Sequence, residues 1–171
     1  MYYAGIGART TPEDVLKKMT GLGKSLASMG FTLRSGGAEG ADEAFERGCD
    51  LFGGTKEIFL PFKGFRRNPS DLYGTTKAAR DIARQFHPAW SRLSNTGWDF
   101  MGRNSYQVLG PNLDTPSAFI VCWTPGGKVT GGTGQALRIA AAYNIPVLNF
   151  GNMSDDEIAD KIFAMEGKLN E

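Results

Sequence analysis

The chain has 171 residues with a formal net charge of +1 at pH 7, a hydrophobic content of 41% and a charged content of 22%. These values are typical of a globular protein, and the length fits one domain with a proper hydrophobic core. The balanced charge argues against general binding to nucleic acid or to a membrane surface, and no apolar run is long enough to span a bilayer.

The two cysteines, Cys49 and Cys122, stand far apart in apolar segments. Their separation matches neither a zinc-binding spacing nor a disulfide framework. Because no signal-peptide pattern precedes them, we expect reduced thiols and a cytoplasmic location. No metal and no cofactor are predicted.

The first half of the chain alternates between strand and helix patterns. An apolar start predicts a strand over residues 1–6, and the glycine turn GIGAR follows it. Thr11 and Pro12 predict a helix start, with Thr11 as the capping hydroxyl and Pro12 in the first helical position. The next elements are predicted as a strand over 31–34, the glycine turn SGGAEGAD, a helix over 41–52 and a strand over 56–60.

Regular patterning stops between residues 61 and 70, where aromatic and basic side chains indicate an extended surface segment. Beyond it, an apolar run that ends in Pro and Gly predicts a buried central strand, and a glycine-rich turn follows. The predicted elements are helices over 75–85, over 98–109 and from 135 onward, strands over 118–123 and 147–150, and a closing helix with a capping box at 154–157.

This alternation predicts one α/β domain over residues 1–171, a Rossmann-like open, mostly parallel sheet with helices on both faces. Ligands of such sheets bind outside the carboxyl ends of the strands, where the three glycine-rich turns would gather. A strand, a glycine turn and a helix N-terminus together present free N–H groups to a phosphate. The alternative is a tight turn that binds nothing.

Several common motifs are absent. The dinucleotide motif GxGxxG lacks its third glycine after Gly5 and Gly7, and there is no GxxxxGK[ST] phosphate loop. The single histidine, His87, precedes a proline in an irregular segment, which favours a structural role. An ordinary dehydrogenase, a P-loop kinase and a Ser-His-Asp hydrolase are therefore not predicted.

Two carboxylates lie in the turn where the second helix begins. Glu39 and Asp42 are placed to accept hydrogen bonds from ribose hydroxyls, although Asp42 is equally suited to cap that helix. Arg9, Arg34 and Arg103 each have the chemistry to bind a phosphate through two hydrogen bonds, with surface ion pairing as the alternative. The three tryptophans, at positions 90, 98 and 123, are candidates for stacking on a base or for the core.

The segments GIGAR, SGGAEGAD, the GRN tripeptide around Arg103 and GGTGQALRIAAAYNIPV together resemble the SLOG superfamily. This superfamily joins the DNA-processing protein A domain, the Lonely Guy phosphoribohydrolases and the YpsA-like families. The likeness extends over residues 3–150 and is closest to the YpsA-like branch. It implies a nucleotide-type ligand and a homo-oligomer. The ligand-binding residues expected from these motifs are Gly7, Arg9, Ser35, Gly36, Gly37, Asn104, Gly131, Gly132, Thr133 and Gly134.

The Lonely Guy enzymes cleave the N-glycosidic bond of a nucleoside monophosphate with an arginine and with the glutamate of a PGGxGTxxE motif. Arg103 matches that arginine, but the position aligned with the glutamate is Leu137. Cleavage develops positive charge on the ribose, which a carboxylate stabilises. If this chain cleaves the bond, Asp42 and Glu39 are the nearest candidates for that carboxylate, and with Arg103 they form the predicted catalytic set.

Three hypotheses therefore remain open. The chain binds a nucleoside phosphate or an ADP-ribose-like ligand and hydrolyses its N-glycosidic bond, or it binds the ligand as a non-catalytic sensor or sequestering module. The third hypothesis, single-strand nucleic-acid binding, rests on the interleaved aromatic and basic residues of segment 62–67. A homo-oligomer is expected through segments 73–85 and 90–100.

Overall fold

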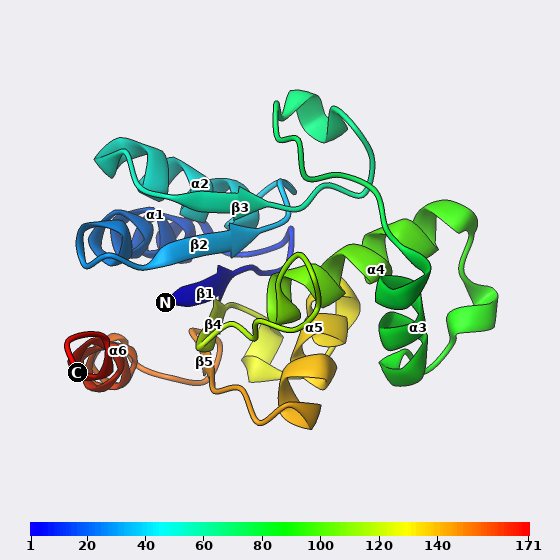
Figure 1. The fold of residues 1–171 in the computed structure, drawn as a ribbon. Helices are drawn as coiled ribbons and strands as arrows, with labels where there is room; N and C mark the ends of the chain where they lie inside the picture. Colours follow the sequence, from blue (N-terminus) through cyan, green and yellow to red (C-terminus); the bar gives the residue numbers. More distant parts are fainter.

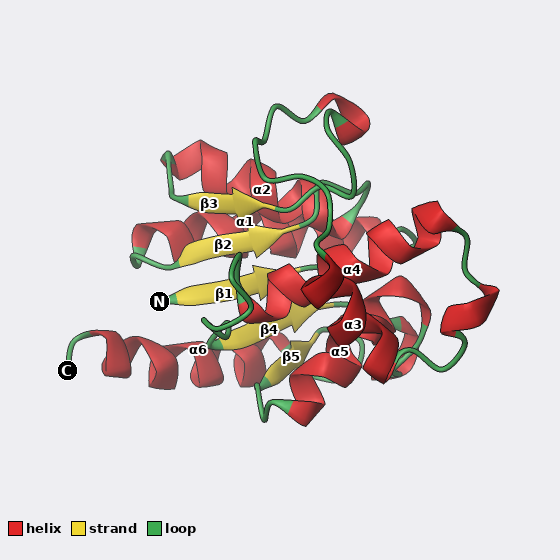
Figure 2. Cartoon of the chain, turned by 45° about the vertical axis from the view of Figure 1, so that its right-hand side comes forward, coloured by secondary structure: helices red, strands yellow, loops and turns green.

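The computed structural model describes all residues from 1 to 171. Five strands form one sheet in which every neighbouring pair is parallel, in the order β3-β2-β1-β4-β5. The strands are β1 (Tyr2–Gly5), β2 (Thr32–Ser35), β3 (Lys56–Ile58), β4 (Phe119–Cys122) and β5 (Val147–Asn149). All the arrows of the sheet point the same way (Figure 2). The α/β, Rossmann-like fold predicted from the sequence is confirmed.

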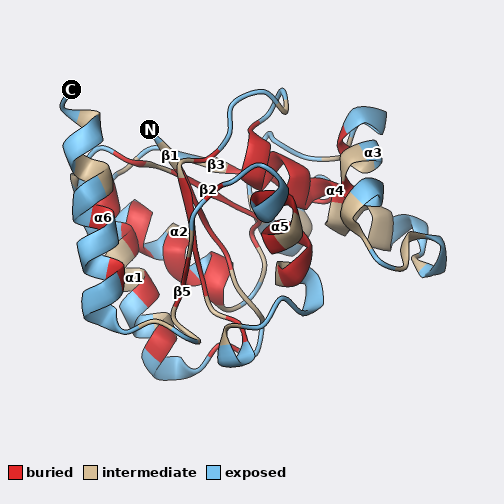
Figure 3. Ribbon diagram, turned by 90° about the horizontal axis from the view of Figure 1, so that it is seen from below, coloured by how far each residue is buried: buried red, intermediate tan, exposed pale blue.

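Six α-helices cover both faces of the sheet (Figure 1). They are α1 (Glu13–Ser28), α2 (Ala41–Phe52), α3 (Lys77–Phe86), α4 (Asn95–Leu109), α5 (Gly131–Ala142) and α6 (Asp155–Leu169). Viewed along the sheet, α1, α2 and α6 lie on one side, and α5, α4 and α3 lie on the other (Figure 3). No helix is both long enough and apolar enough to cross a membrane.

Each face of the sheet has its own hydrophobic core. The strands are short and, apart from the edge strand β3, mostly buried, because helices cover both of their faces. One core lies between the sheet and the α1, α2 and α6 layer, and the other joins the sheet to α4 and α5. Both cysteines are buried and free, as their apolar surroundings predicted. The sheet is therefore fixed from both sides, and its carboxyl edge is a rigid support for a site.

Tyr3 lies in the middle of the first core, where its ring is stacked on Phe119 at 5.6 Å and meets Phe45 edge-on at 6.2 Å. Its hydroxyl is buried and has no hydrogen-bond partner. Burial raises the pKa of Tyr3 far above its ordinary value, so the ring stays neutral. A buried hydroxyl without a partner destabilises the folded state.

The substitution Tyr3→Phe is therefore expected to stabilise the protein, by about 1 kcal/mol, because it removes an unsatisfied donor and keeps the ring. Tyr106 is the matched control, since its hydroxyl accepts from the Thr76 N–H at 2.8 Å. Urea unfolding should show that Tyr106→Phe costs about as much as Tyr3→Phe gains. Destabilisation by Tyr3→Phe would contradict the assignment of an unpartnered hydroxyl.

Four helix starts differ from the prediction, and the first of these is α3, which begins at Lys77 rather than at 75. The glycine run was assigned to a turn before Gln135, yet α5 begins at Gly131, whose φ of +66° marks the entry of the chain into the helix. Thr11 does not cap α1, because its hydroxyl donates to the Ala8 carbonyl at 2.5 Å and Pro12 takes the cap position. Helix α4 starts at Asn95 rather than at 98, because Ser94 caps it by accepting from the Gly97 N–H. The capping box at the start of α6 is confirmed.

Arg34, a candidate phosphate ligand in the sequence, is instead a buried structural residue. Its side chain is 1% exposed and pairs with Glu57 at 2.9 Å. It also donates to the Thr115 carbonyl at 2.5 Å and to the Ser117 hydroxyl at 3.3 Å. These contacts join β2 and β3 to the segment that leads into β4.

Candidate functional site

A cavity of about 370 Å³ lies at the carboxyl edge of the sheet. Its lining comes from the segments that follow β1, β2 and β4, together with one face of α4. Strands β1 and β4 are neighbours from which the chain proceeds to opposite halves of the sheet, so the cavity occupies the topological switch point. The lining residues are Ile6, Gly7, Ala8, Arg9, Ala38, Asp42, Gly97, Phe100, Met101, Arg103, Asn104, Gln107, Gly132 and Thr133.

The turn after β1 requires a glycine because the N-terminus of α2 passes close to it. A Cβ atom on Gly7 would lie 2.6 Å from the Cβ of Ala41. The chain then turns outward to Arg9, which is exposed, belongs to no ion pair and lines the cavity at its rim. Arg9 therefore offers an uncommitted positive charge at the cavity mouth.

Asp42 lies in the first turn of α2 and is only 4% exposed. It does not cap that helix, which has Gly40 at its cap, and instead accepts from the Ala38 N–H at 3.3 Å. Burial raises the pKa of Asp42 to about 6, against the opposing effect of the Arg103 charge and of backbone hydrogen bonds. The cavity wall thus holds a carboxyl group that titrates close to neutral pH.

Arg103 lies on α4 and is 7% exposed. Its Nη1 donates to the Gly36 carbonyl in the turn after β2, and its guanidinium lies 5.4 Å from the centre of the Phe100 ring. The Nε atom is buried without a partner. Burial lowers the pKa of Arg103 and the nearby Asp42 raises it, so the charge remains. A buried guanidinium with a free donor in a cavity wall is suited to bind an anionic or hydroxyl-bearing ligand.

The N-terminus of α5 forms the opposite part of the rim. Its cap residue, Thr130, makes no side-chain cap, and the first N–H groups of a helix have no partner within the helix. Gly132 and Thr133 line the cavity there, and the Asn104 amide holds the Gly132 carbonyl at 3.1 Å. The helix dipole adds positive potential to this side of the mouth.

The structure therefore brings seven predicted residues together: Gly7, Arg9, Asp42, Arg103, Asn104, Gly132 and Thr133. The other predicted residues do not line the cavity. Ser35 is fully buried and donates to the Gly5 carbonyl, and Gly36 and Gly37 form the wall behind Arg103 and beside Leu60. Gly134 donates its N–H to Thr130 inside the helix, and Gly131 sets the helix entry.

Glu39, the second predicted carboxylate, also lies outside the cavity. Its side chain is 67% exposed and lies 3.5 Å from Arg66. It borders a separate groove between α1 and α2. Asp42 is consequently the one carboxylate among the cavity-lining residues.

The remaining aromatic and histidine candidates lie elsewhere. Trp90 and Trp98 stack on each other with ring centres 5.7 Å apart, and Trp123 packs against the first core. His87 accepts from the Ala89 N–H at 3.0 Å in the connection between α3 and α4, which agrees with the structural role predicted for it. No group of three or more His, Cys, Asp or Glu side chains is arranged to hold a metal ion.

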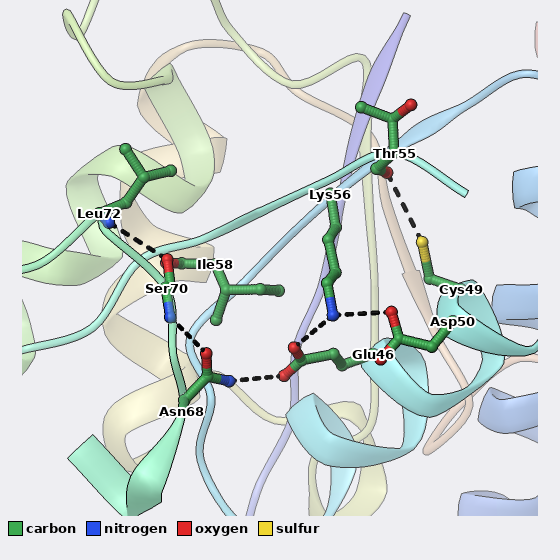
Figure 4. Close-up of polar contacts among 9 residues, drawn as sticks. All are labelled: Glu46, Cys49, Asp50, Thr55, Lys56, Ile58, Asn68, Ser70 and Leu72. Carbon is green, nitrogen blue, oxygen red and sulfur yellow. Dashed lines mark hydrogen bonds and ion pairs between the residues drawn. The ribbon is translucent and has the colours of Figure 1, made fainter. Parts of the chain in front are cut away.

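Residues 61–70, predicted as an extended surface segment, instead belong to a folded loop that spans residues 61–72. Its ends meet where the Leu60 N–H donates to Leu72 and the Gly74 N–H donates to Leu60. Asn68 donates to Glu46 at 2.9 Å, and the Ser70 hydroxyl donates to the Ile58 carbonyl (Figure 4). Glu46 and Asp50 also bind Lys56, so α2, β3 and the loop share one polar network (Figure 4).

The same loop supports the cavity wall through aromatic packing. The Phe65 ring lies 5.3 Å from the ring centres of both Phe62 and Phe100, and Phe100 lines the cavity. Arg66 is held by Glu39 and Glu43, each at 3.5 Å. The loop therefore fixes Phe100, while the positive charge of Arg66 is largely matched by carboxylates.

Sequence reasoning missed the contribution of α4 beyond Arg103 and Asn104. Gln107 is 2% exposed and lines the cavity one helical turn after Arg103, and Phe100 and Met101 line it three and two residues before Arg103. The spacing of four residues between Arg103 and Gln107 places both on one helix face, which was the available signal.

The fold and the cavity thus define a Rossmann-like α/β protein with a ligand-sized site at its switch point. No protein-family model matches the sequence, and no curated protein matches it. Among solved structures, DNA processing protein A from Helicobacter pylori is similar with a TM-score of 0.61 and 18% identity, over 99% of this chain and 80% of that one. The molybdenum cofactor carrier protein from Chlamydomonas reinhardtii has a TM-score of 0.56 and 19% identity, over 98% of this chain and 86% of that one.

A third similar structure, of the protein TM1055, has a TM-score of 0.55 and 22% identity, over 85% of this chain and 71% of that one. Sequence identities this low establish a shared fold and nothing beyond it. The fold that the resemblance in the sequence implied is thereby confirmed, since the chain shares it with these three proteins.

Proposed function

We propose that this protein binds a nucleotide or a nucleotide-derived small molecule in the cavity at the carboxyl edge of the sheet. The observation that carries the proposal is the pair of buried, oppositely charged side chains in the cavity wall, Arg103 and Asp42, without a direct ion pair between them. Keeping two charges out of water is costly unless they are compensated, and a polar ligand provides that compensation.

The arrangement of charges gives the ligand an orientation. Its phosphate binds at the rim, between the N-terminus of α5 and the exposed Arg9, where the positive potential is uncompensated. Its sugar enters the deeper part, toward Asp42 and Arg103. A volume of about 370 Å³ is at the small end of the range for ligand pockets, which favours a mononucleotide-sized molecule.

Two of the similar structures are named for their ligands, a molybdenum cofactor and single-stranded DNA. We favour the small molecule for this chain, because its net charge is +1 and the exposed Arg66 of loop 61–72 is paired with two glutamates. Strong single-strand binding depends on a continuous basic groove with accessible aromatic faces.

The test begins with mass spectrometry of small molecules released from the purified protein. Calorimetric titrations with AMP, GMP, CMP, UMP and ADP-ribose then compare the wild type with Arg103→Met. We expect this substitution to weaken binding by roughly 10- to 100-fold, as hydrogen bonds from a charged group are lost. Arg84→Met, on the exposed surface of α3, is the matched control and should bind like the wild type. Equal affinities of the two variants would refute the assigned cavity.

The second candidate function is hydrolysis of the N-glycosidic bond, and the observation that favours it is Asp42 as a buried carboxyl in the cavity wall with a pKa of about 6. Such a group is suited to stabilise charge developing on the ribose. Chromatography of the titrated nucleotides decides between the candidates. Release of free base by the wild type supports the hydrolase, and intact nucleotide throughout supports the binding module.

A further inference from the structure

Gln107 has a side chain that the protein itself does not use. It lies on α4, is 2% exposed and lines the cavity, yet its amide group makes no hydrogen bond within the protein. Its backbone carbonyl accepts from the Ser117 hydroxyl at 2.7 Å, and its amide nitrogen packs against Gly36. The other buried glutamine, Gln135, differs, because its amide donates to the Ala83 carbonyl and accepts from Arg138. The Gln107 amide is not among the atoms that are shut off from solvent without a partner, so it is accessible from the cavity, where a ligand can pair with it.

The depth of the side chains divides the cavity into two regions. Asp42, Arg103 and Gln107 are each less than a tenth exposed, whereas Arg9 and Gly132 are exposed at the rim. The buried region contains an acceptor in the carboxylate, donors in the guanidinium and both kinds of group in the amide. Its partner must therefore donate and accept within a small volume.

Vicinal sugar hydroxyls match this requirement better than the other parts of a nucleotide. A phosphate only accepts hydrogen bonds when ionised, and the Asp42 carboxylate would repel it. A base needs a flat apolar surface, and the only aromatic ring of the lining is Phe100, beside the Arg103 guanidinium. A hydroxyl both donates and accepts, so a diol satisfies the carboxylate and the amide together.

We propose that Gln107, with Asp42, binds the vicinal hydroxyls of the ligand's sugar, so that the cavity accepts ribonucleotides and rejects their 2′-deoxy counterparts. This inference rests on the proposed binding of a nucleotide and adds the sugar class and a specificity-determining residue to it. The physical reason for rejection is that a deoxy sugar leaves the buried Gln107 amide unpaired.

Calorimetry with ribose 5-phosphate, 2-deoxyribose 5-phosphate, AMP and 2′-deoxy-AMP tests the inference. The wild type should bind each ribose compound at least tenfold more tightly than its deoxy counterpart. This ratio corresponds to a difference in binding free energy of about 1.4 kcal/mol. Gln107→Met should lower the affinity for ribose compounds to the level of the deoxy compounds, and leave affinity for deoxy compounds within about twofold. Gln85→Met, on the exposed surface of α3, is the matched control and should keep the preference.

The outcomes separate this inference from the proposal on which it rests. Binding of ribose and deoxyribose compounds with equal affinity by the wild type would overturn the role of Gln107 and leave nucleotide binding standing. Equal weakening of both classes by Gln107→Met would also overturn it, since that result is the mark of a structural role. If the wild type binds none of the four probes and none of the nucleotides titrated above, both proposals fail. The wild-type comparison keeps the test decisive even if Gln107→Met does not fold.

Discussion

Replacing Asp42 by asparagine is expected to make the ligand-free protein more stable at neutral pH. Burial raises the pKa of Asp42 from 3.8 to about 6 in the folded state. Between these values the folded protein binds more protons than the unfolded chain, so the free energy of unfolding falls as pH rises. The difference in pKa corresponds to about 3 kcal/mol, present below about pH 4 and lost once pH exceeds about 6.

Urea unfolding of the wild type and of Asp42→Asn across this pH range measures the effect. The free energy of unfolding of Asp42→Asn should not fall by this amount, about 3 kcal/mol, as pH rises. At pH 7 the variant should therefore be more stable than the wild type by up to about 3 kcal/mol. His87 affects stability in the opposite sense, because burial and the Arg138 charge lower its pKa. Comparing the two proteins removes its contribution, since both contain it. If the stabilities of the two proteins change with pH in the same way, the pKa of Asp42 is not raised in the folded state.

The same substitution separates function from folding. Asparagine retains an oxygen for the Ala38 N–H, which donates to Asp42 at 3.3 Å, but it loses the charge. On the proposed function, the carboxylate is stabilised when a sugar hydroxyl donates to it, so Asp42→Asn should weaken binding while the fold gains stability. Opposite changes in affinity and stability are expected where a buried charge is kept for ligand binding.

The fold could be predicted because its local signals agree with its tertiary structure. Helix α2 extends from residue 41 to 52 as predicted, and Ser154 and Glu157 form the predicted capping box. Because parallel strands all end at the same edge of the sheet, the glycine turns that follow them were predicted to gather at that edge, and the cavity lies there. The start of α5 was missed because glycine is a weak helix former, so a glycine run reads as a turn.

The site itself was less predictable, because side-chain burial depends on contacts distant in sequence. Nothing local distinguishes Arg34, which became structural, from Arg103, which lines the cavity. Glu39 and Asp42 are three residues apart in one turn, yet one is exposed and the other buried. Gln107 lies four residues after Arg103 on the same face of α4, and that spacing was the clue that was not used.

Loss of the Arg34 side chain is expected to cause the largest destabilisation of any substitution considered. Arg34→Met removes the 2.9 Å ion pair with Glu57 and the hydrogen bond to the Thr115 carbonyl. Breaking a buried pair from one side costs about 3 to 5 kcal/mol, and the lower end applies because the Glu57 side chain keeps 21% exposure to water. Arg47→Met is the matched control. Its pairing with Glu43 is exposed and 4.0 Å long, so it should cost less than about 1 kcal/mol.

Urea unfolding of Arg34→Met, Arg47→Met and the double variant Arg34→Met with Glu57→Met measures these differences. The double variant should recover part of the loss, because it removes the stranded carboxylate and leaves apolar surfaces in contact. Arg34 also donates to the Ser117 hydroxyl, which in turn donates to the Gln107 carbonyl. The ion pair therefore anchors the last turn of α4, the helix that carries Arg103 and Gln107 into the cavity. Equal costs for Arg34→Met and Arg47→Met would show that the buried pair has no such role.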